Sequence, residues 1–280
     1  MAGVHETRKN VLLEIFGKAK IVIGVIHMRP LPGSPEYGGE PIEAIYEASL
    51  QDALRYSRGG IDGLILENHG DIPFAKPEAI SYETPTVMAV AAYKIRETVG
   101  LPIGINILAN AAIPALAVAK AAGCAFIRVN QWANAYVANE GFIEGAAARA
   151  LRYRSWISAK IVRIFADVHV KHGSHAIVAD RSVSELARDV EFFGADVVIA
   201  TGHRTGDPPT VEEIQAIRNG TRLPLLAGSG VNEDNVGEIF PLVDGIIIAS
   251  ALKEEGAWWN PVSEARVRRF MERVRRMRGE

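Results

Sequence analysis

The segment PLLAGSGVNEDNVGEIFPLVDGIIIASALK (residues 224–253) contains the clearest structural signal in the chain. Two short apolar runs, Pro224–Gly228 and Gly245–Ser250, flank a stretch long enough for a helix. Short continuous apolar runs bounded by glycine are typical of parallel strands that are buried on both faces. The segment therefore predicts a strand–helix–strand unit of an α/β fold.

The same unit recurs along the rest of the chain. Helix candidates with capping residues and terminal glycines lie between the apolar runs. The eight predicted strands are Ile21–Met28, Gly63–Asn68, Ile103–Leu108, Phe126–Asn130, Arg163–Val168, Val197–Thr201, Pro224–Gly228 and Gly245–Ser250. Because right-handed crossovers close eight such units naturally, we predict a (β/α)8 TIM barrel of the phosphate-binding type. An open doubly wound sheet is the competing fold, but no G-x-G-x-x-G follows the first strand, so no nicotinamide or flavin is expected.

The chain length of 280 residues fits one barrel, which we take as a single domain over residues 1–280. Residues 1–20 form an N-terminal extension, in which we expect a short helix near the barrel bottom. Residues 131–145 belong to a connection that is long for a barrel, and we interpret them as an active-site loop. We expect Trp258 and Trp259 to cover the barrel bottom or an oligomer seam.

Composition limits the class of protein. The formal net charge is −2, so there is no global basic field, and nucleic acid is not an expected partner. Cys124 is the only cysteine and no apolar run approaches ~20 residues, which indicates a cytoplasmic protein without a transmembrane segment. The arginine-rich tail, residues 266–278, is interpreted as a solvated helix face, with peripheral membrane contact as the alternative. We expect a homo-oligomer.

Barrel enzymes place their chemistry at the C-terminal ends of the strands, so the polar residues there are the catalytic candidates. Asp167, His169 and Lys171 alternate with valines, which predicts three titratable groups on one face that shift each other's pKa values. Glu67 is a second acid–base candidate. His27 shares a face with the inward residues of the first strand. Its role is either catalytic or structural, as a histidine that hydrogen-bonds the backbone at the barrel rim.

Substrate-binding candidates follow from the same alternation. An arginine inside a barrel is costly unless a phosphate or a carboxylate pairs with it, so Arg128 either binds substrate or pairs with Glu67 or Asp167. One of Glu67 and Asn68 faces inward, and the other fixes the loop. The remaining polar candidates at strand ends are Asn68, Asn106, Asn130 and Thr201.

The cofactor is not specified by these residues, although a divalent metal is a candidate. Asp167, His169 and Glu67 form the better ligand set by residue type. His169, His172 and His175 lack the helical i, i+4 spacing, which disfavours a site built from them alone.

The last two strands predict a phosphate site. Glycine-rich backbone can donate N–H groups to an anion, and a helix starting near Asn232 would add positive potential. The residues expected to hold the phosphate are Gly228, Ser229, Gly230, Ser250 and Ala251.

Taken together, these motifs resemble the BtpA/SgcQ family from about residue 12 to residue 275. The resemblance rests on these strings: GVIHMRPLPGSP (24–35), GLILENHGDIPF (63–74), GINILANA (104–111), RVN (128–130), FADVHVKH (165–172), ATGHRTGDPP (200–209), LLAGSGV (225–231) and IIASALK (247–253). The resemblance implies a cytosolic barrel of the phosphate-binding type. One cyanobacterial branch of the family is tied to photosystem I biogenesis as a peripheral thylakoid protein, and another branch accompanies sugar metabolism.

Three functions remain open from the sequence. The first is an enzyme, an isomerase, lyase or hydrolase, acting on a sugar phosphate or nucleotide by acid–base chemistry. The second is a non-catalytic assembly or stability factor peripheral to a membrane complex, as the photosystem branch implies. The third is a sensor that binds a phosphorylated metabolite without converting it.

Overall fold

The computed structural model describes residues 10–202, 204 and 206–280. Within these ranges, eight parallel strands close into a barrel in the order β1-β11-β10-β9-β7-β4-β3-β2. They are β1 (Ile21–His27), β2 (Gly63–Glu67), β3 (Ile103–Asn106), β4 (Phe126–Val129), β7 (Arg163–Asp167), β9 (Val197–Ala200), β10 (Leu225–Gly228) and β11 (Gly245–Ile248). The eight predicted strands are confirmed, and the closed ring excludes the open sheet.

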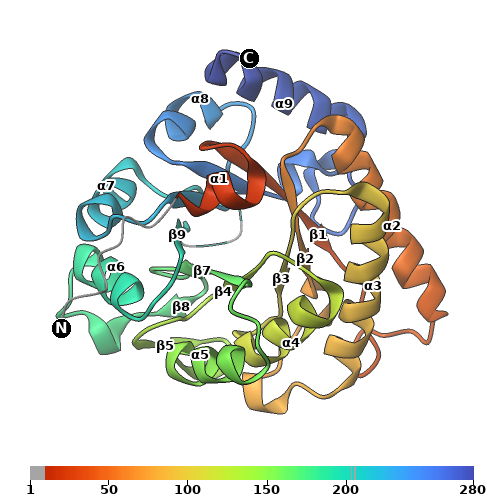
Figure 1. Cartoon of the computed structure of the whole chain (residues 1–280), viewed down its shortest axis with the longest axis horizontal. Helices are drawn as coiled ribbons and strands as arrows, with labels where there is room; N and C mark the ends of the chain where they lie inside the picture. The colour runs from red at the N-terminus through yellow and green to blue at the C-terminus, as the bar shows by residue number, and fades with distance from the viewer. Residues whose placement is uncertain (1–9, 203, 205) are drawn as a thin grey trace.

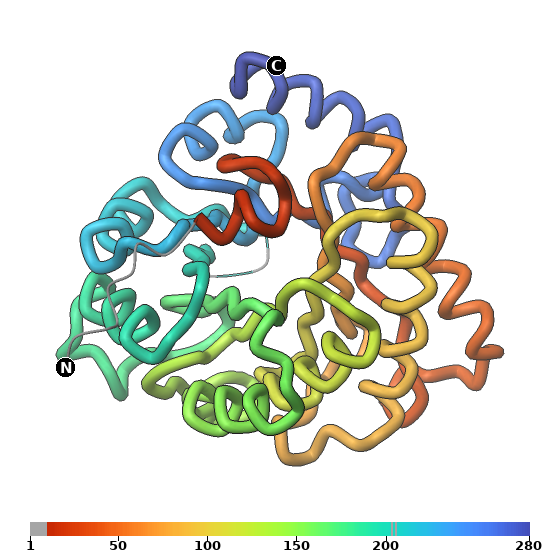
Figure 2. The backbone as a smooth tube through the Cα atoms, viewed as in Figure 1, coloured from red at the N-terminus to blue at the C-terminus, as the bar shows by residue number. Residues whose placement is uncertain are grey.

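Helices surround the barrel on its outer side, in chain order around the ring (Figures 1 and 2). They are α2 (Ile42–Gly59), α3 (Glu83–Val99), α4 (Ala112–Ala122), α5 (Ala147–Trp156), α6 (Val183–Phe192), α7 (Val211–Gly220), α8 (Val236–Ile239) and α9 (Glu264–Arg278). The last helix, α9, packs against α2 and so completes the ring. Alternate strand residues face these helices and form the outer apolar core.

The barrel interior is filled by the other set of strand residues. Ile23, Ile65, Phe165 and Leu226 belong to this inner cluster. Gly104 on β3 makes room for a large ring, because a Cβ there would lie 2.2 Å from Phe126 Cε2. The lower layers are therefore apolar and closed, which leaves only the C-terminal end of the strands for chemistry.

A short helix, α1 (Val11–Phe16), closes the bottom of the barrel and lies across the ring in Figure 1. Its N-cap residue Asn10 accepts a hydrogen bond from the Leu12 amide at 3.0 Å. Val11 and Leu12 are buried in the inner cluster. The predicted N-terminal helix is therefore present, and residues 1–9 of the extension lie outside the described part of the chain.

The segment 131–145 is not an irregular loop. It forms a hairpin of β5 (Ala135–Ala138) and β6 (Gly141–Glu144), and β8 (Gly173–Ser174) pairs with β5. This small sheet joins the connection after β4 to the connection after β7. It therefore braces the loop that carries Lys171.

Helix α9 buries its apolar stripe and exposes its arginines. Val267, Phe270 and Val274 are fully buried, whereas Met277 is 36% exposed. Of the exposed arginines, Arg268 pairs with Glu264 one turn earlier at 2.6 Å. In the part of the chain that is described, no helix has the length and apolar character needed to cross a membrane.

Candidate functional site

A cavity of about 220 Å³ lies at the C-terminal end of the barrel. Because parallel strands end at the same edge, residues far apart in the sequence meet there. Its titratable lining consists of His27, Glu67, His69, Arg128 and Lys171. Other lining residues come from the two glycine-rich loops and the loop after β9: Gly206, Ser229, Gly230, Val231, Asn232, Ala249, Ser250 and Ala251. The cavity is thus lined by one set of titratable side chains, here called its titratable side, and by one set of loop residues.

The loop after β10 depends on glycine at Gly230. This residue has φ +64°, and a Cβ there would lie 2.1 Å from the Pro208 nitrogen. The loop after β9 therefore packs directly on the loop after β10. Gly228, at the end of β10, packs closely on β9, since an added Cβ would lie 2.7 Å from Ile199 Cγ2, and it does not line the cavity.

Ser229 adopts φ 118°, which side-chain-bearing residues rarely do. Its hydroxyl oxygen accepts hydrogen bonds from Lys171 Nζ at 3.3 Å and from the Gly206 amide at 3.4 Å. Residues held in such a conformation often lie at functional sites, where the surrounding structure offsets the strain. Ser229 thus links the loop after β10 with the titratable side of the cavity.

The helix expected near Asn232 starts later in the chain. Helix α8 begins at Val236 and has four residues. Asn232 instead caps a turn, since its Oδ1 accepts from the amides of Asp234 and Asn235 at 2.8 and 3.2 Å. A single helical turn has little dipole, so any anion held here must depend on loop backbone and side chains.

His27, Glu67 and His69 cluster on the titratable side. Glu67 Oε1 lies 3.1 Å from His69 Nδ1 and 3.7 Å from His27 Nε2. The two imidazole rings stack with their centroids 4.4 Å apart. Sequence analysis did not identify His69, although its position two residues after Glu67 was a usable signal. Within the described residues, this trio is the one group of histidines and carboxylates close enough to share a metal ion.

The environment fixes the charge state of two members of this trio. Burial, followed by the neighbouring His69, lowers the pKa of His27 to about 3, so its ring is neutral at pH 7. Burial alone would raise the pKa of Glu67, but the hydrogen bond and charge of His69 outweigh it and lower that pKa to about 2. Glu67 is therefore a carboxylate at neutral pH, and neither group is suited to donate a proton there.

Arg128 pairs with Asp167, one of its two predicted protein partners. Two hydrogen bonds of 3.1 Å run from Nε and Nη2 of Arg128 to the two carboxylate oxygens. Asn130 Nδ2 donates a third bond to Asp167 at 3.3 Å, and Asn106 Nδ2 donates to Asn130 at the same distance. Both oxygens of Asp167 are thus occupied, which favours a positioning role over the predicted proton transfer.

The predicted cluster of Asp167, His169 and Lys171 does not form as expected. Strand β7 ends at Asp167, so alternation does not continue through the next residues. His169 turns away, with Nδ1 3.6 Å from Glu213 Oε1 and its ring against His175 at 3.9 Å. Lys171 alone reaches the cavity. Burial, with Arg128 as the next cause, lowers the pKa of Lys171 to about 8.

The predicted metal ligand set of Asp167, His169 and Glu67 is corrected by the same geometry. Asp167 is held by Arg128, and His169 is held near Glu213. Only Glu67 belongs to the group that is close enough to share an ion, and its partners there are His27 and His69.

Two predicted binding residues fix loops instead. Asn68 donates to Asp71 Oδ2 at 2.9 Å and accepts from the Leu108 amide at 2.8 Å. Thr201 donates to the His169 carbonyl at 3.1 Å. Neither lines the cavity. Of the adjacent residues Glu67 and Asn68, it is thus Glu67 that faces the site.

Trp258 lies at the site rather than at the barrel bottom. Its carbonyl is 3.1 Å from His27 Nδ1, and its ring meets that of His69 edge-on at 4.6 Å. The buried Lys253 anchors its loop, because Nζ donates to the Asn260 carbonyl and lies 3.7 Å from Asp52. No motif in the sequence pointed to this placement.

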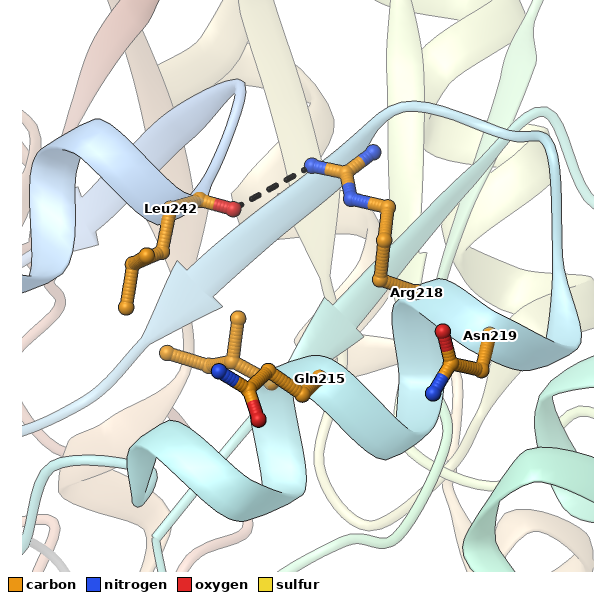
Figure 3. A pocket seen from close by; sticks show the side chains of 5 residues that line it. Gln215, Arg218, Asn219 and Leu242 are labelled. Carbon is orange, nitrogen blue, oxygen red and sulfur yellow. Dashed lines mark hydrogen bonds between the residues drawn. The ribbon is translucent and has the colours of Figure 1, made fainter.

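A second hollow, of about 350 Å³, lies beside α7 and is shown in Figure 3. Arg218 occupies one wall, donating to the Leu242 carbonyl at 3.4 Å and to Asp244 at 2.9 Å. Asp244 directly precedes β11, so this hollow is at the opposite end of the barrel. Its only charged lining residue is already paired, which makes it a poor candidate for chemistry.

Comparison with protein families and relatives gives a consistent result. A family model described as the BtpA family matches residues 18–276. An uncharacterized protein of Archaeoglobus fulgidus is 40% identical over 90% of this chain and 97% of its own. The protein named photosystem I biogenesis protein BtpA of Synechocystis is 36% identical, over 93% of this chain and 90% of its own.

Solved structures share the fold at low sequence identity. Phosphoribosyl anthranilate isomerase of Thermus thermophilus has a TM-score of 0.55 and 14% identity, over 92% of this chain and 99% of its own. Orotidine 5'-monophosphate decarboxylase of Methanocaldococcus jannaschii has a TM-score of 0.53 and 11% identity, over 91% and 98%. These similarities support the TIM-barrel fold alone.

Proposed function

The chain belongs to the BtpA family, and we propose that it is an enzyme acting on a phosphorylated small metabolite, a sugar phosphate or a nucleotide. The observation that carries this proposal is the shared cavity, in which both loops after the last two strands face titratable side chains. A phosphate bound by the loops would hold the rest of the substrate against those side chains.

The proposed division of labour follows the two sides of the cavity. Ser229, Gly230, Ser250 and Ala251, which line the cavity, would surround the phosphate, and Gly228 would support them from the end of β10. Lys171 is the best acid–base candidate, because a pKa of about 8 allows it to give and accept protons near neutral pH. Proton transfer by Lys171 is compatible with isomerase, lyase or hydrolase chemistry.

Binding tests the proposal first. We expect sugar phosphates or nucleotides to raise the melting temperature of the protein, measured by thermal shift, and their unphosphorylated counterparts to leave it unchanged. If no phosphorylated compound stabilises the protein, the proposal fails.

Turnover then separates an enzyme from a sensor. For each stabilising compound, product formation by the wild-type protein is compared with that of Lys171→Met. We expect turnover in the wild type and at least a ~100-fold loss in the variant, the usual contribution of a positioned acid or base. Tight binding with no turnover in the wild type would favour the sensor.

The named relative supports a second candidate function. The Synechocystis protein is called a photosystem I biogenesis protein, and an assembly factor needs a surface for partners. Trp156 and Phe192, at the ends of α5 and α6, are 80% and 83% exposed. Sedimentation with anionic lipid vesicles tests peripheral membrane contact, and replacing both residues by serine should abolish it if this role holds.

Light scattering tests the expected homo-oligomer, for which the same residues are the proposed contact.

A further inference from the structure

We infer that His27, Glu67 and His69 form a binding site for a divalent transition-metal ion at the mouth of the barrel. The site goes beyond phosphate binding, since it lies on the titratable side of the cavity and uses none of the residues assigned to the phosphate. The two proposals can therefore fail separately.

The spacing of the three donors fits a shared ion. Ligand bonds of about 2.0–2.2 Å in a tetrahedral zinc site place neighbouring donor atoms roughly 3.3 Å apart. The Glu67 oxygen lies 3.1 Å from His69 Nδ1 and 3.7 Å from His27 Nε2. One of these distances is slightly shorter and the other slightly longer than the separation of donors around a zinc ion. All three ligand atoms lie within 4.8 Å of one another. Binding of an ion would displace the proton that His69 Nδ1 donates to Glu67, and small side-chain adjustments would then bring the three ligand atoms around the ion.

The hydrogen bond of His27 orients its ring for metal binding. A carbonyl oxygen can only accept, so the contact of 3.1 Å to the Trp258 carbonyl places the proton on Nδ1. A neutral ring then presents the Nε2 lone pair toward the Glu67 carboxylate. At 3.7 Å this contact is too long for a hydrogen bond, and two electron-rich atoms face each other. A cation between them would resolve the repulsion.

The backbone contact is also the kind that supports metal-binding histidines. Such ligands commonly donate their second N–H to a carbonyl or carboxylate, which fixes the tautomer and the ring orientation. The carbonyl of Trp258 is held by a loop that Lys253 anchors from a fully buried position. The Trp258 ring covers the edge of His69, which limits its rotation.

The donor set indicates the class of metal. Two imidazoles and one carboxylate suit zinc or another first-row transition ion, whereas magnesium prefers oxygen ligands and octahedral geometry. Three protein ligands leave coordination positions open, as in catalytic sites. Because all three residues line the cavity, those positions would be accessible from the space that Ser229 and Ser250 also line. A bound metal would thus meet a substrate oxygen.

Metal titration of the full-length protein tests the inference. Protein stripped with a chelator is titrated with Zn²⁺, with Co²⁺ as a spectroscopic substitute and with Mg²⁺ as the hard-ion comparison. We expect one equivalent of Zn²⁺ or Co²⁺ per chain, visible absorption bands from bound Co²⁺, and binding of Mg²⁺ at least ~100-fold weaker. No phosphate compound is added, so the result does not depend on the proposed function.

Variants locate the ion. Glu67→Gln and His69→Ala should each weaken Zn²⁺ binding by at least ~100-fold and remove the Co²⁺ bands, with circular dichroism unchanged. The matched control is His172→Asn, which removes an exposed histidine outside the trio and suits the φ of 64° at that position. Saturable binding that survives both ligand variants, or that the control abolishes equally, would overturn the site. Absence of binding in the wild type would do the same.

Discussion

At the scale of single residues, Lys171 connects the two sides of the cavity. Its ammonium donates to Ser229 in the loop after β10 and lies in the field of Arg128, Glu67 and Asp167. Burial and the Arg128 charge lower the pKa of Lys171 to about 8, although the carboxylates of Glu67, Asp167 and Asp207 oppose them. A phosphate dianion would favour the charged form, so binding and protonation of Lys171 are linked.

The linkage has a definite sign. Phosphate esters are dianionic above a pKa near 6, so from pH 7 to pH 9 the main change is loss of the Lys171 proton. If only the ammonium form binds, affinity for a phosphorylated ligand should fall about tenfold over that range. Calorimetric titration at several pH values measures this. The Lys171→Met variant should bind the phosphorylated ligand more weakly, with an affinity that does not change with pH. A wild-type affinity that does not change with pH would refute the linkage.

The buried pair of Arg128 and Asp167 makes a prediction about stability. Replacing one partner leaves an uncompensated buried charge, which typically costs 3–5 kcal/mol (an order-of-magnitude range). Arg128→Met should therefore lower the free energy of unfolding by about that amount, whereas Arg128→Met with Asp167→Leu should recover most of it. Urea denaturation provides the measurement. Equal stability of the single variant and the wild type would show that the pair is not a structural element.

Residue patterns predicted the inward side chains only as far as the strands extend. His27, Arg128 and Asp167 lie on the side that alternation indicated, because each belongs to or directly ends a regular strand. For Glu67 and Asn68 the sequence left the choice open, and the structure places Glu67 at the cavity. Alternation failed for His169, since the chain leaves β7 at Asp167 and its direction is then set by packing against the small sheet. Tertiary contacts of that kind have no local sequence signature.

At the scale of elements, the loop after β10 is the most constrained part of the site. Gly230 combines a left-handed backbone with close contact to Pro208. The capped helices and glycine-bounded strands were predictable, because caps and apolar runs are local. The hairpin β5–β6 was not, since its strands are short and partly exposed and pair with a distant two-residue strand.

A substitution in that loop tests its role. Gly230→Ala places a Cβ 2.1 Å from the Pro208 nitrogen and costs about 1–2 kcal/mol for the left-handed conformation alone. We expect a lower melting temperature and at least ~tenfold weaker binding of a phosphorylated ligand. The matched control is Gly237→Ala in α8, where the added Cβ meets only Arg273 at 3.5 Å. If both variants bind like the wild type, the loop does not hold the phosphate.

At the scale of the whole molecule, the barrel explains why distant motifs form one cavity. Parallel strands bring His27 near the start of the chain beside Ser250 near its end. The fold followed from the sequence because eight similar units can close in few ways. The trio of His27, Glu67 and His69 followed only in part. His27 and Glu67 end neighbouring strands in register, whereas His69 lies in the turn after β2, whose direction strand alternation does not predict.

The most direct test of the central claim is the position of a bound oxyanion. Tungstate mimics phosphate and scatters strongly, so crystals of the protein soaked with it should show an anomalous peak at its site. We expect a peak between the loops after β10 and β11, with oxygens in hydrogen-bond reach of Gly230 and Ser250 backbone N–H groups. The peak should disappear in Gly230→Ala and persist in Gly237→Ala. No peak in the cavity, or binding only elsewhere on the barrel, would show that these loops do not hold the phosphate.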